Sequence, residues 1–282
     1  MALTTASNSG GDILRPEIVG PLIVQPVIAE SVAAQVSTVV QTASHDYRLP
    51  IVQADPTAAW VAESAEITPT DADLGAVVAT PAKVAALSVI SRELADDSSP
   101  EAADVIGQGL ARDIARKIDL AFFTAVGGVA PVGLTGATSA QDVTYDATDL
   151  DVFAEAISLA ETVGARTTAF VTNPTVALAL SQLKEATGSI KPLLSTDSAA
   201  AGTAPGARTV LGVPLYVAPD VATNTVWAIP KDRVYVVIRN DTRVEVDRSR
   251  FFTSDQVAIR ATMRVAFALP HQEAIVRIAP AA

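Results

Sequence analysis

Apolar residues recur at every fourth position along one stretch of the chain, and this pattern constrains the fold more than any other feature. The recurring residues are Ile106, Leu110, Ile114, Ile118 and Phe122. Their spacing places these side chains on one face of an α-helix. Upstream, Ser98-Ser-Pro-Glu101 has the spacing of a capping box, and downstream Gly127-Gly128 predicts the helix end. A helix of about 27 residues is roughly 40 Å long, which is enough to span a flat domain.

A second stretch, from Leu49 to Ala82, carries acidic residues and no basic residue. Its acids are Asp55, Glu63, Glu66, Asp71 and Asp73. The flanking segments 47–52 and 77–91 have the character of strands and are predicted to pair as a long hairpin. A connection this long is normally functional or disordered. Trp60 argues against a solvated tether, because a linker has no use for an indole. A metal loop, a lid and an arm that grips another molecule are the alternatives.

The rest of the chain predicts an α+β fold. Residues 10–26 contain three prolines and are predicted to run extended over a surface, whereas 27–42 has apolar residues at helical spacing and is predicted to form a short helix. Helices are predicted at 149–163 and from Asn173-Pro174 to 186, on either side of a strand at 167–172. Residues 195–205 have loop composition. Strands are predicted at 210–217, 225–229, 233–238, 243–246, 257–267 and 274–278, so that the C-terminal quarter forms a sheet.

The composition sets limits on function. The 282 residues are about half apolar, contain no cysteine and carry a formal net charge of −11. A chain this acidic lacks the basic footprint of a nucleic-acid-binding protein. We expect no signal peptide and no membrane span, and a soluble protein that is cytoplasmic where it is made. The charge is uneven: residues 1–110 carry 14 acids and 4 bases, while residues 231–282 carry 6 acids and 9 bases. This asymmetry fits docking between the two regions, within one chain or between copies, as well as two differently solvated surfaces.

Catalytic motifs are incomplete wherever they begin. His45 and His271 are the only histidines, and no G-x-S-x-G elbow occurs. The glycines of Gly128–Gly133 have phosphate-loop spacing but lack the following lysine. Asp71-Ala-Asp73 begins like a calcium loop, but Ala82 stands where the closing glutamate belongs. We therefore expect no enzyme activity, no catalytic or cofactor-binding residues and no metal site.

The densest basic set lies near the C-terminal end of the sequence. Its members are Arg239, Arg243, Arg248, Arg250, Arg260 and Arg264. Few aromatic residues are interleaved with them, so a nucleic-acid patch is not favoured. Docking of another protein is the better interpretation.

Several segments together resemble the major capsid proteins of tailed bacteriophages of the Hong Kong 97 type. They are Trp60-Val-Ala-Glu63, Lys83–Ser91, Glu93–Ser98 with the long helix that follows, Ala121-Phe-Phe-Thr124 with Gly127-Gly128 and Pro131–Leu134, Leu211–Asp220, Arg243–Val246, Phe252–Arg260 with Arg264-Val265, and Ala274–Ile278. They occur in the family's order over nearly the whole chain.

The resemblance implies a Hong Kong 97-type α+β capsid fold. It implies an N-terminal arm (1–45), an extended β-hairpin loop (46–91), a peripheral domain with a long spine helix (92–136), an axial α+β domain (137–229) and the C-terminal sheet of the peripheral domain (230–282). The implied function is self-assembly, as hexamers and pentamers, into an icosahedral shell around phage double-stranded DNA, without sequence-specific binding to that DNA. The implied partners are scaffolding, portal and decoration proteins, and the implied location is the virion, after assembly in the host cytoplasm.

Two departures from the family pattern refine this expectation. Some members join subunits through a lysine on the extended loop, but here the loop has no lysine and Lys83 lies at its base. We therefore expect non-covalent contacts between subunits. Some relatives also carry a long N-terminal scaffolding segment, whereas here the arm begins close to Met1, so scaffolding is expected from a separate protein or is not needed. An encapsulin-type nanocompartment shell is the alternative function, because fold alone does not separate the two.

The acidic loop and the basic C-terminal strands are predicted to meet between neighbouring subunits. On the loop the expected contacts are Trp60, Glu63, Glu66, Asp71 and Asp73. On the peripheral surface they are Arg243, Arg248, Arg250, Arg260 and Arg264. Trp60 is expected to anchor the contact by burial.

Overall fold

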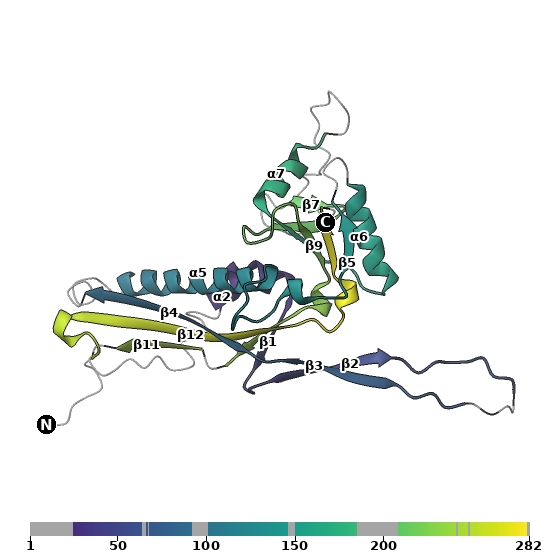
Figure 1. Ribbon diagram of the computed structural model, residues 1–282, viewed down its shortest axis with the longest axis horizontal. Coiled ribbons are helices and arrows are strands. Elements are labelled where there is room, and N and C mark those ends of the chain that lie inside the picture. Colours follow the sequence, from purple (N-terminus) through teal and green to yellow (C-terminus); the bar gives the residue numbers. More distant parts are fainter. Residues whose placement is uncertain are drawn as a thin grey trace.

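The computed structural model describes residues 25–63, 66, 68–91, 101–145, 150–184, 208–240, 242–247 and 249–280. Figure 1 shows three parts: a long flat body that carries helix α5, a second helix-and-sheet unit above one end of it, and a narrow two-stranded arm that projects beyond the body. The prediction of an α+β fold is confirmed.

The body is a helix packed on a five-stranded sheet. Helix α5 (Glu101–Phe123) is the predicted long helix. It ends before Gly127-Gly128, the predicted end, and both glycines lie in the following loop with positive φ. Ser98 of the predicted capping box lies outside the described residues. The sheet consists of β1 (Thr38–Thr42), β10 (Tyr235–Arg239), β12 (Gln256–Ala268), β11 (Arg243–Asp247) and β4 (Ala82–Ser91).

The predicted apolar stripe of α5 forms the core of the body. Ile114, Ile118 and Phe122 are buried against one face of the sheet. Phe122 contacts the ring of Phe267 on β12 edge to face, with ring centres 5.0 Å apart. Alternate residues of β4 are more buried, as expected for a strand with one face on a core. The other residues of β4 therefore point away from this core.

The helix predicted over 27–42 is wrong in its second half. The structure has two short helices, α2 (Gln25–Glu30) and α3 (Val32–Val36), followed by strand β1. Strand β1 pairs in parallel with β10, so the β-branched Val39 and Val40 extend the sheet. Asp119 of α5 accepts hydrogen bonds from Ser31 Oγ (2.6 Å) and from the backbone N–H groups of Val32 (3.0 Å) and Ala33 (2.9 Å). This carboxylate therefore caps α3 from another helix.

The second unit is a six-stranded sheet with two helices. Its strands, in spatial order, are β5 (Gln141–Thr144), β13 (Val276–Ala279), β9 (Val226–Ile229), β6 (Ala169–Thr172), β8 (Val213–Val217) and β7 (Arg208–Val210). Its helices α6 (Asp151–Thr162) and α7 (Pro174–Gln182) confirm the predicted pair, with Asn173 capping α7. The loop predicted at 195–205 lies outside the described residues. Short 3₁₀ turns lie at Leu134–Gly136, Lys231–Arg233, Phe252–Ser254 and Gln272–Ala274.

The prediction that the C-terminal quarter forms one sheet is only partly right. Strands β10, β11 and β12 lie together in the body, but β13 lies in the second unit between β5 and β9. The predicted strand 210–217 is a hairpin, β7 and β8, which turns at Leu211 and Gly212, both with positive φ. Because β13 follows β12 in the sequence, the chain returns to the second unit after the strands of the body are complete.

The arm is the hairpin of β2 (Tyr47–Ala54) and β3 (Asp73–Ala79), which among the described strands pair with each other alone (Figure 1). The predicted pairing of 47–52 with 77–91 is right for β3 and wrong for β4, which pairs with β12 over its whole length. The chain changes partner at Thr80-Pro81, where proline has no N–H for a ladder. Residues 82–91 bury more apolar surface by packing Val84, Ala86 and Ile90 against the core under α5 than they would by extending the arm.

Candidate assembly surfaces

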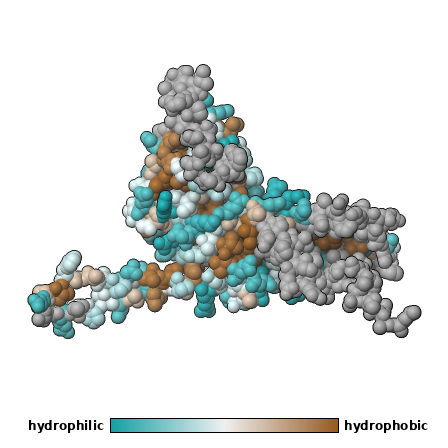
Figure 2. All heavy atoms as spheres, turned by 180° about the vertical axis from the view of Figure 1, so that it is seen from behind, coloured by the Kyte–Doolittle hydropathy of each residue, from teal (hydrophilic) through white to brown (hydrophobic). Residues whose placement is uncertain are grey.

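The arm exposes apolar side chains to solvent along its paired strands. Val52, Leu74 and Val78 are 46, 70 and 50% exposed. Val52 and Leu74 lie directly opposite each other in the register. Figure 2 shows brown, hydrophobic spheres along this narrow projection. An isolated two-stranded ribbon is marginally stable in water, and an exposed apolar face on one marks a surface that another molecule covers.

The tip of the arm carries the predicted loop contacts. Trp60 is fully exposed, and Glu63, Glu66, Asp71 and Asp73 are exposed as well. Within the described part of the chain none of these carboxylates has an ion-pair partner. The hydroxyl of Thr70 donates to the carbonyl of Thr57 across the tip at 3.3 Å. The tip therefore presents a bare indole and bare negative charge on one projection.

The basic residues of the body meet on the face of the sheet opposite α5. Register places Arg264 opposite Lys83, Arg260 opposite both Glu245 and Leu87, and Arg243 opposite Thr262. These side chains line an open pocket of about 280 Å³ whose lining is Lys83, Arg243, Glu245, Arg260, Thr262, Met263 and Arg264. We call this set the cationic pocket. An ion pair joins Arg260 to Glu245.

The structure therefore brings together three of the five predicted basic contacts, Arg243, Arg260 and Arg264. Arg250 is exposed but does not line the pocket, and its guanidinium lies 5.7 Å from the ring centre of Phe251. Arg248 lies outside the described residues. Sequence reasoning missed Lys83 as a member of the pocket. The alternation of β4 was the signal that could have found it, because it places Lys83 on the face away from the core.

The cationic pocket gathers positive charge on neighbouring strands. Lys83 on β4 and Arg264 on β12 lie directly opposite each other, and Arg260 in the same pocket pairs with Glu245. Leu87 and Val89, 57 and 40% exposed, continue the same face of β4 beyond the pocket. The face thus combines positive charge with apolar area, and the arm combines negative charge with apolar area.

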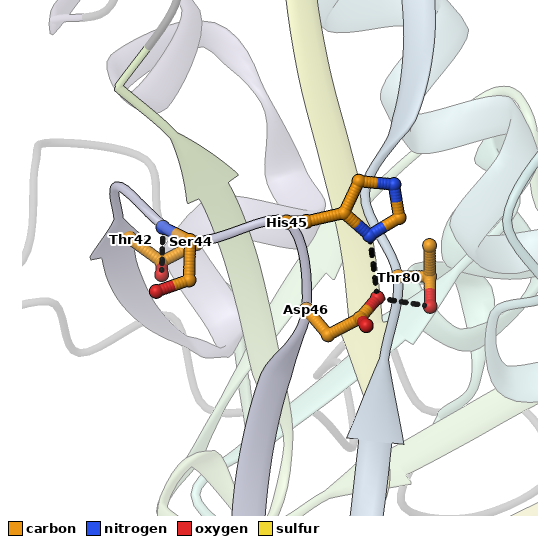
Figure 3. Close-up of polar contacts among 5 residues, drawn as sticks. All are labelled: Thr42, Ser44, His45, Asp46 and Thr80. Atoms are coloured by element: carbon orange, nitrogen blue, oxygen red, sulfur yellow. Dashed lines mark hydrogen bonds and ion pairs between the residues drawn. The ribbon is translucent and has the colours of Figure 1, made fainter.

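The base of the arm is held by a small group of polar side chains (Figure 3). Asp46 Oδ1 accepts a hydrogen bond from Thr80 Oγ1 at 2.8 Å and lies 3.0 Å from His45 Nδ1. These hydrogen bonds, that of Thr80 first, hold the pKa of Asp46 below its ordinary value. In the preceding turn the backbone N–H of Ser44 donates to Thr42 Oγ1 at 3.1 Å.

The glycine pattern that suggested a phosphate loop has a packing explanation. A Cβ on Gly133 would lie 2.2 Å from the carbonyl oxygen of Phe122, so only glycine lets this loop return against the end of α5. Among the described residues no group of three or more His, Cys, Asp or Glu side chains gathers at distances that suit a metal ion. No described helix has the length and apolar character needed to span a membrane.

A long helix on a sheet, a second helix-and-sheet unit and a projecting arm with uncovered apolar faces define a subunit built to associate with copies of itself. The chain belongs to the Phage capsid family, which it matches over residues 10–279. The resemblance noted in the sequence is thereby confirmed.

Solved capsid structures share this fold. The capsid of an empty GTA particle, computed with C5 symmetry, is 21% identical, with a TM-score of 0.74 and 90% of each chain covered. A structure from Microbacterium phage Oxtober96 is 18% identical with a TM-score of 0.72, covering 89% of this chain and 91% of the phage chain. One from Mycobacterium phage Adephagia is 16% identical with a TM-score of 0.70, covering 89 and 90%. No curated protein sequence matches the chain.

Proposed function

We propose that this chain is the major capsid protein of a phage-type head and that its copies close into an icosahedral shell around double-stranded DNA. The observation that carries the proposal is the arm. A capsid-family subunit carries a hairpin whose apolar faces and indole are exposed among the residues that the structure describes. The family match is to phage capsids, so an encapsulin-type compartment is not favoured.

The arm of one subunit lies across the sheet of its neighbour in this proposal. The acids Glu63, Glu66, Asp71 and Asp73 are matched by the positive charge of the cationic pocket and of Arg248 and Arg250. Single ion pairs on a surface contribute about 0.2–1 kcal/mol each, so they set register and partner more than strength. Trp60 supplies the buried anchor, because aromatic residues carry most of the binding energy of an interface.

The two units of the chain take different places in the shell. The body with α5 corresponds to the peripheral domain, and the six-stranded unit corresponds to the axial domain that clusters at the centres of hexamers and pentamers. Residues 1–45 are assigned to an N-terminal arm, of which residues 1–24 lie outside the described part of the chain and strand β1 belongs by pairing to the body. Residues 46–91 form the extended loop, of which β4 is by pairing part of the body.

The shell is held without covalent links between subunits, because the arm offers no lysine between Leu49 and Ala82. No catalytic step, cofactor or metal is assigned to the subunit. An acidic wall suits a container that encloses DNA without sequence-specific binding and releases it, because acidic side chains do not hold phosphate groups. Scaffolding, portal and decoration proteins are the further partners, and assembly takes place in the host cytoplasm.

Electron microscopy of the purified, expressed chain tests the proposed function. Closed icosahedral particles of a size that holds a phage genome would support it. A small shell with protein cargo would overturn it, and so would a chain that stays monomeric when it is co-expressed with its scaffolding protein.

Charge reversal tests the contact itself. Asp71→Lys with Asp73→Lys should reduce closed particles, and so should Arg243→Glu with Arg264→Glu, because each change puts like charges together. Combining the four substitutions should restore particles in part. No recovery in the combined variant would place the arm somewhere other than on the cationic pocket. The pair Asp151→Lys with Glu155→Lys on α6 is the matched control, with the same change of charge at a distance from the arm.

Tryptophan fluorescence measures whether Trp60 becomes buried during assembly. The chain has two tryptophans: Trp60 is fully exposed and Trp227 is only 3% exposed. A blue shift of emission on assembly therefore reports burial of Trp60, because Trp227 is already buried. A Trp60→Phe variant should show no such shift, and a shift that survives this substitution would argue against the anchor.

A further inference from the structure

The arm is joined to the body by only two short connections. One runs from β1 to β2 through residues 43–46, and the other runs from β3 to β4 through Thr80-Pro81. Beyond these connections the described strands of the arm pair with each other and with no other strand. The direction of the arm is therefore decided at its base.

Small angular changes at the base become large displacements at the tip. A strand of eight residues extends about 26 Å at 3.3 Å per residue, and a rotation of about 10° at its base moves its far end by about 5 Å. Such a displacement is larger than the reach of a hydrogen bond or a van der Waals contact. A subunit whose arm must find a neighbour therefore needs its base fixed.

Among the described residues, a small apolar cluster packs the base of the arm against the sheet. Ala79, at the end of β3, is buried in a small cluster with Val237, Ala266 and Ala268 of the sheet, and Tyr47 and Val77 pack partly against it. The buried members of this cluster are alanine and valine, whose side chains make no hydrogen bond that would set the direction of the arm.

We propose that Asp46 is a positioning residue that sets the direction of the arm. Its carboxylate oxygen Oδ1 accepts the Thr80 hydroxyl across 34 residues of sequence, so one side chain joins the two connections (Figure 3). Tyr47 and Ala79 are paired in the ladder, which makes Asp46 and Thr80 the next opposing positions. The side-chain hydrogen bond thus adds one directional link at the point where the chain enters β2 and leaves β3 for β4.

The neighbours of Asp46 keep this acceptor charged and in place. The ring nitrogen Nδ1 of His45 lies 3.0 Å from the same oxygen and donates to it, because an ionised carboxylate only accepts. Arg48 on β2 adds a favourable charge, and the pKa of Asp46 is held below its ordinary value. The hydrogen bond from Ser44 N–H to Thr42 Oγ1 shapes the turn that leads into His45. The group is exposed, so it directs the arm and adds little to the stability of the fold.

This inference deepens the proposed function and predicts a measurement that does not depend on assembly. The chain has no cysteine, so Ala58→Cys at the tip and Lys117→Cys on α5 give two unique sites for spin labels. Pulsed electron resonance on unassembled subunits then gives the distribution of tip-to-body distances. Asp46→Ala and Thr80→Val should broaden this distribution by about 5 Å, the displacement expected for a rotation of about 10°.

Matched variants separate positioning from general loss of structure. Thr80→Ser keeps the hydroxyl and should retain the narrow distribution. Asp247→Ala removes a similar carboxylate, which accepts from the backbone N–H (2.8 Å) and Oγ (2.6 Å) of Ser249, and should also leave the distribution narrow. The thermal unfolding midpoints of Asp46→Ala and Thr80→Val should stay near that of the unsubstituted chain.

The proposal would be overturned if the distribution of tip-to-body distances had the same width in Asp46→Ala, Thr80→Val and the unsubstituted chain. A broadened distribution combined with a large loss of thermal stability would also overturn it, because Asp46 would then support the fold and not the direction of the arm. Broadened distributions with undiminished shell formation would uphold Asp46 as the positioning residue and reject the role of the arm in assembly. The two proposals can therefore fail separately.

Discussion

The hydrogen bonds of Asp119 lead to a prediction about how the N-terminal segment is attached. This carboxylate on α5 is 7% exposed and accepts from Ser31 Oγ and from the N–H groups of Val32 and Ala33. Ser31 and Ala33 are fully buried, so no water replaces the lost acceptor easily. The change to test is Asp119→Ala.

The expected loss of stability in Asp119→Ala follows from the hydrogen-bond donors that lose their acceptor. Each buried donor that loses its acceptor costs about 1–3 kcal/mol. The Ser31 hydroxyl can rotate, which leaves two backbone N–H groups and a cost of about 3 kcal/mol at 1.5 kcal/mol each. Removing a buried carboxylate also removes its desolvation penalty, which the raised pKa of Asp119 reports. A net loss of about 2 kcal/mol in the free energy of unfolding is expected.

Urea unfolding of unassembled subunits measures this loss. Hydrogen exchange at Val32, Ala33 and Ala34 should accelerate more than exchange in the six-stranded unit, because the cap of α3 is lost first. Asp113→Ala is the matched control: it removes an exposed aspartate from the same helix and should change the unfolding free energy by less than about 0.5 kcal/mol. If Asp119→Ala and Asp113→Ala proved equally mild, the cap would not hold the segment.

Three further outcomes are expected. Trp60→Ala should weaken each arm contact by about 2 kcal/mol or more, while Glu63→Gln should cost at most about 1 kcal/mol, as the subunit concentration needed for shell formation would show. Gly133→Ala should prevent stable folding because its Cβ meets the Phe122 carbonyl, whereas Gly109→Ala within α5 should raise the unfolding free energy by about 1 kcal/mol, and thermal unfolding compares the two. Burial raises the pKa of Asp119 in the folded state, so the folded chain takes up this proton first as pH falls. The stabilising effect of this titration is full below the ordinary carboxyl value of 3.8 and is lost as pH rises through the raised pKa, so the difference between the unsubstituted chain and Asp119→Ala should widen in acid.

Sequence periodicity and capping signals predicted the helices that bury one apolar face. The four-residue spacing that ends in Phe122 gave α5, and Asn173-Pro174 gave the start of α7. The same rule failed for residues 27–42, where valines at helical spacing also suit a strand, and pairing with β10 decided between the two. Local pattern cannot supply such a partner.

The arm shows the same limit in its return strand. Segments 73–79 and 82–91 both suit a strand, and only tertiary packing under α5 takes the second of them to β12. The predicted acids and Trp60 do lie together on one projection, since neighbours in sequence stay neighbours on a hairpin.

The cationic pocket was predictable only in part. The alternation of β12 places Arg260, Thr262 and Arg264 on one face. The position of Lys83 depends on the pairing of β4 with β12, which puts Lys83 opposite Arg264, a residue about 180 positions later in the sequence. The link between Asp46 and Thr80 was likewise hidden, because nothing local marks two polar residues 34 positions apart as partners.

Strand β13 also has a consequence for the order of events during synthesis. It lies between β5 and β9, and among the described strands β5 has no other partner. The second unit therefore stays open on one side until residues 276–279 have been made, long after its helices exist. A nascent chain presents an unfinished surface to its neighbours, so subunits become competent to join a shell only once this late strand is in place.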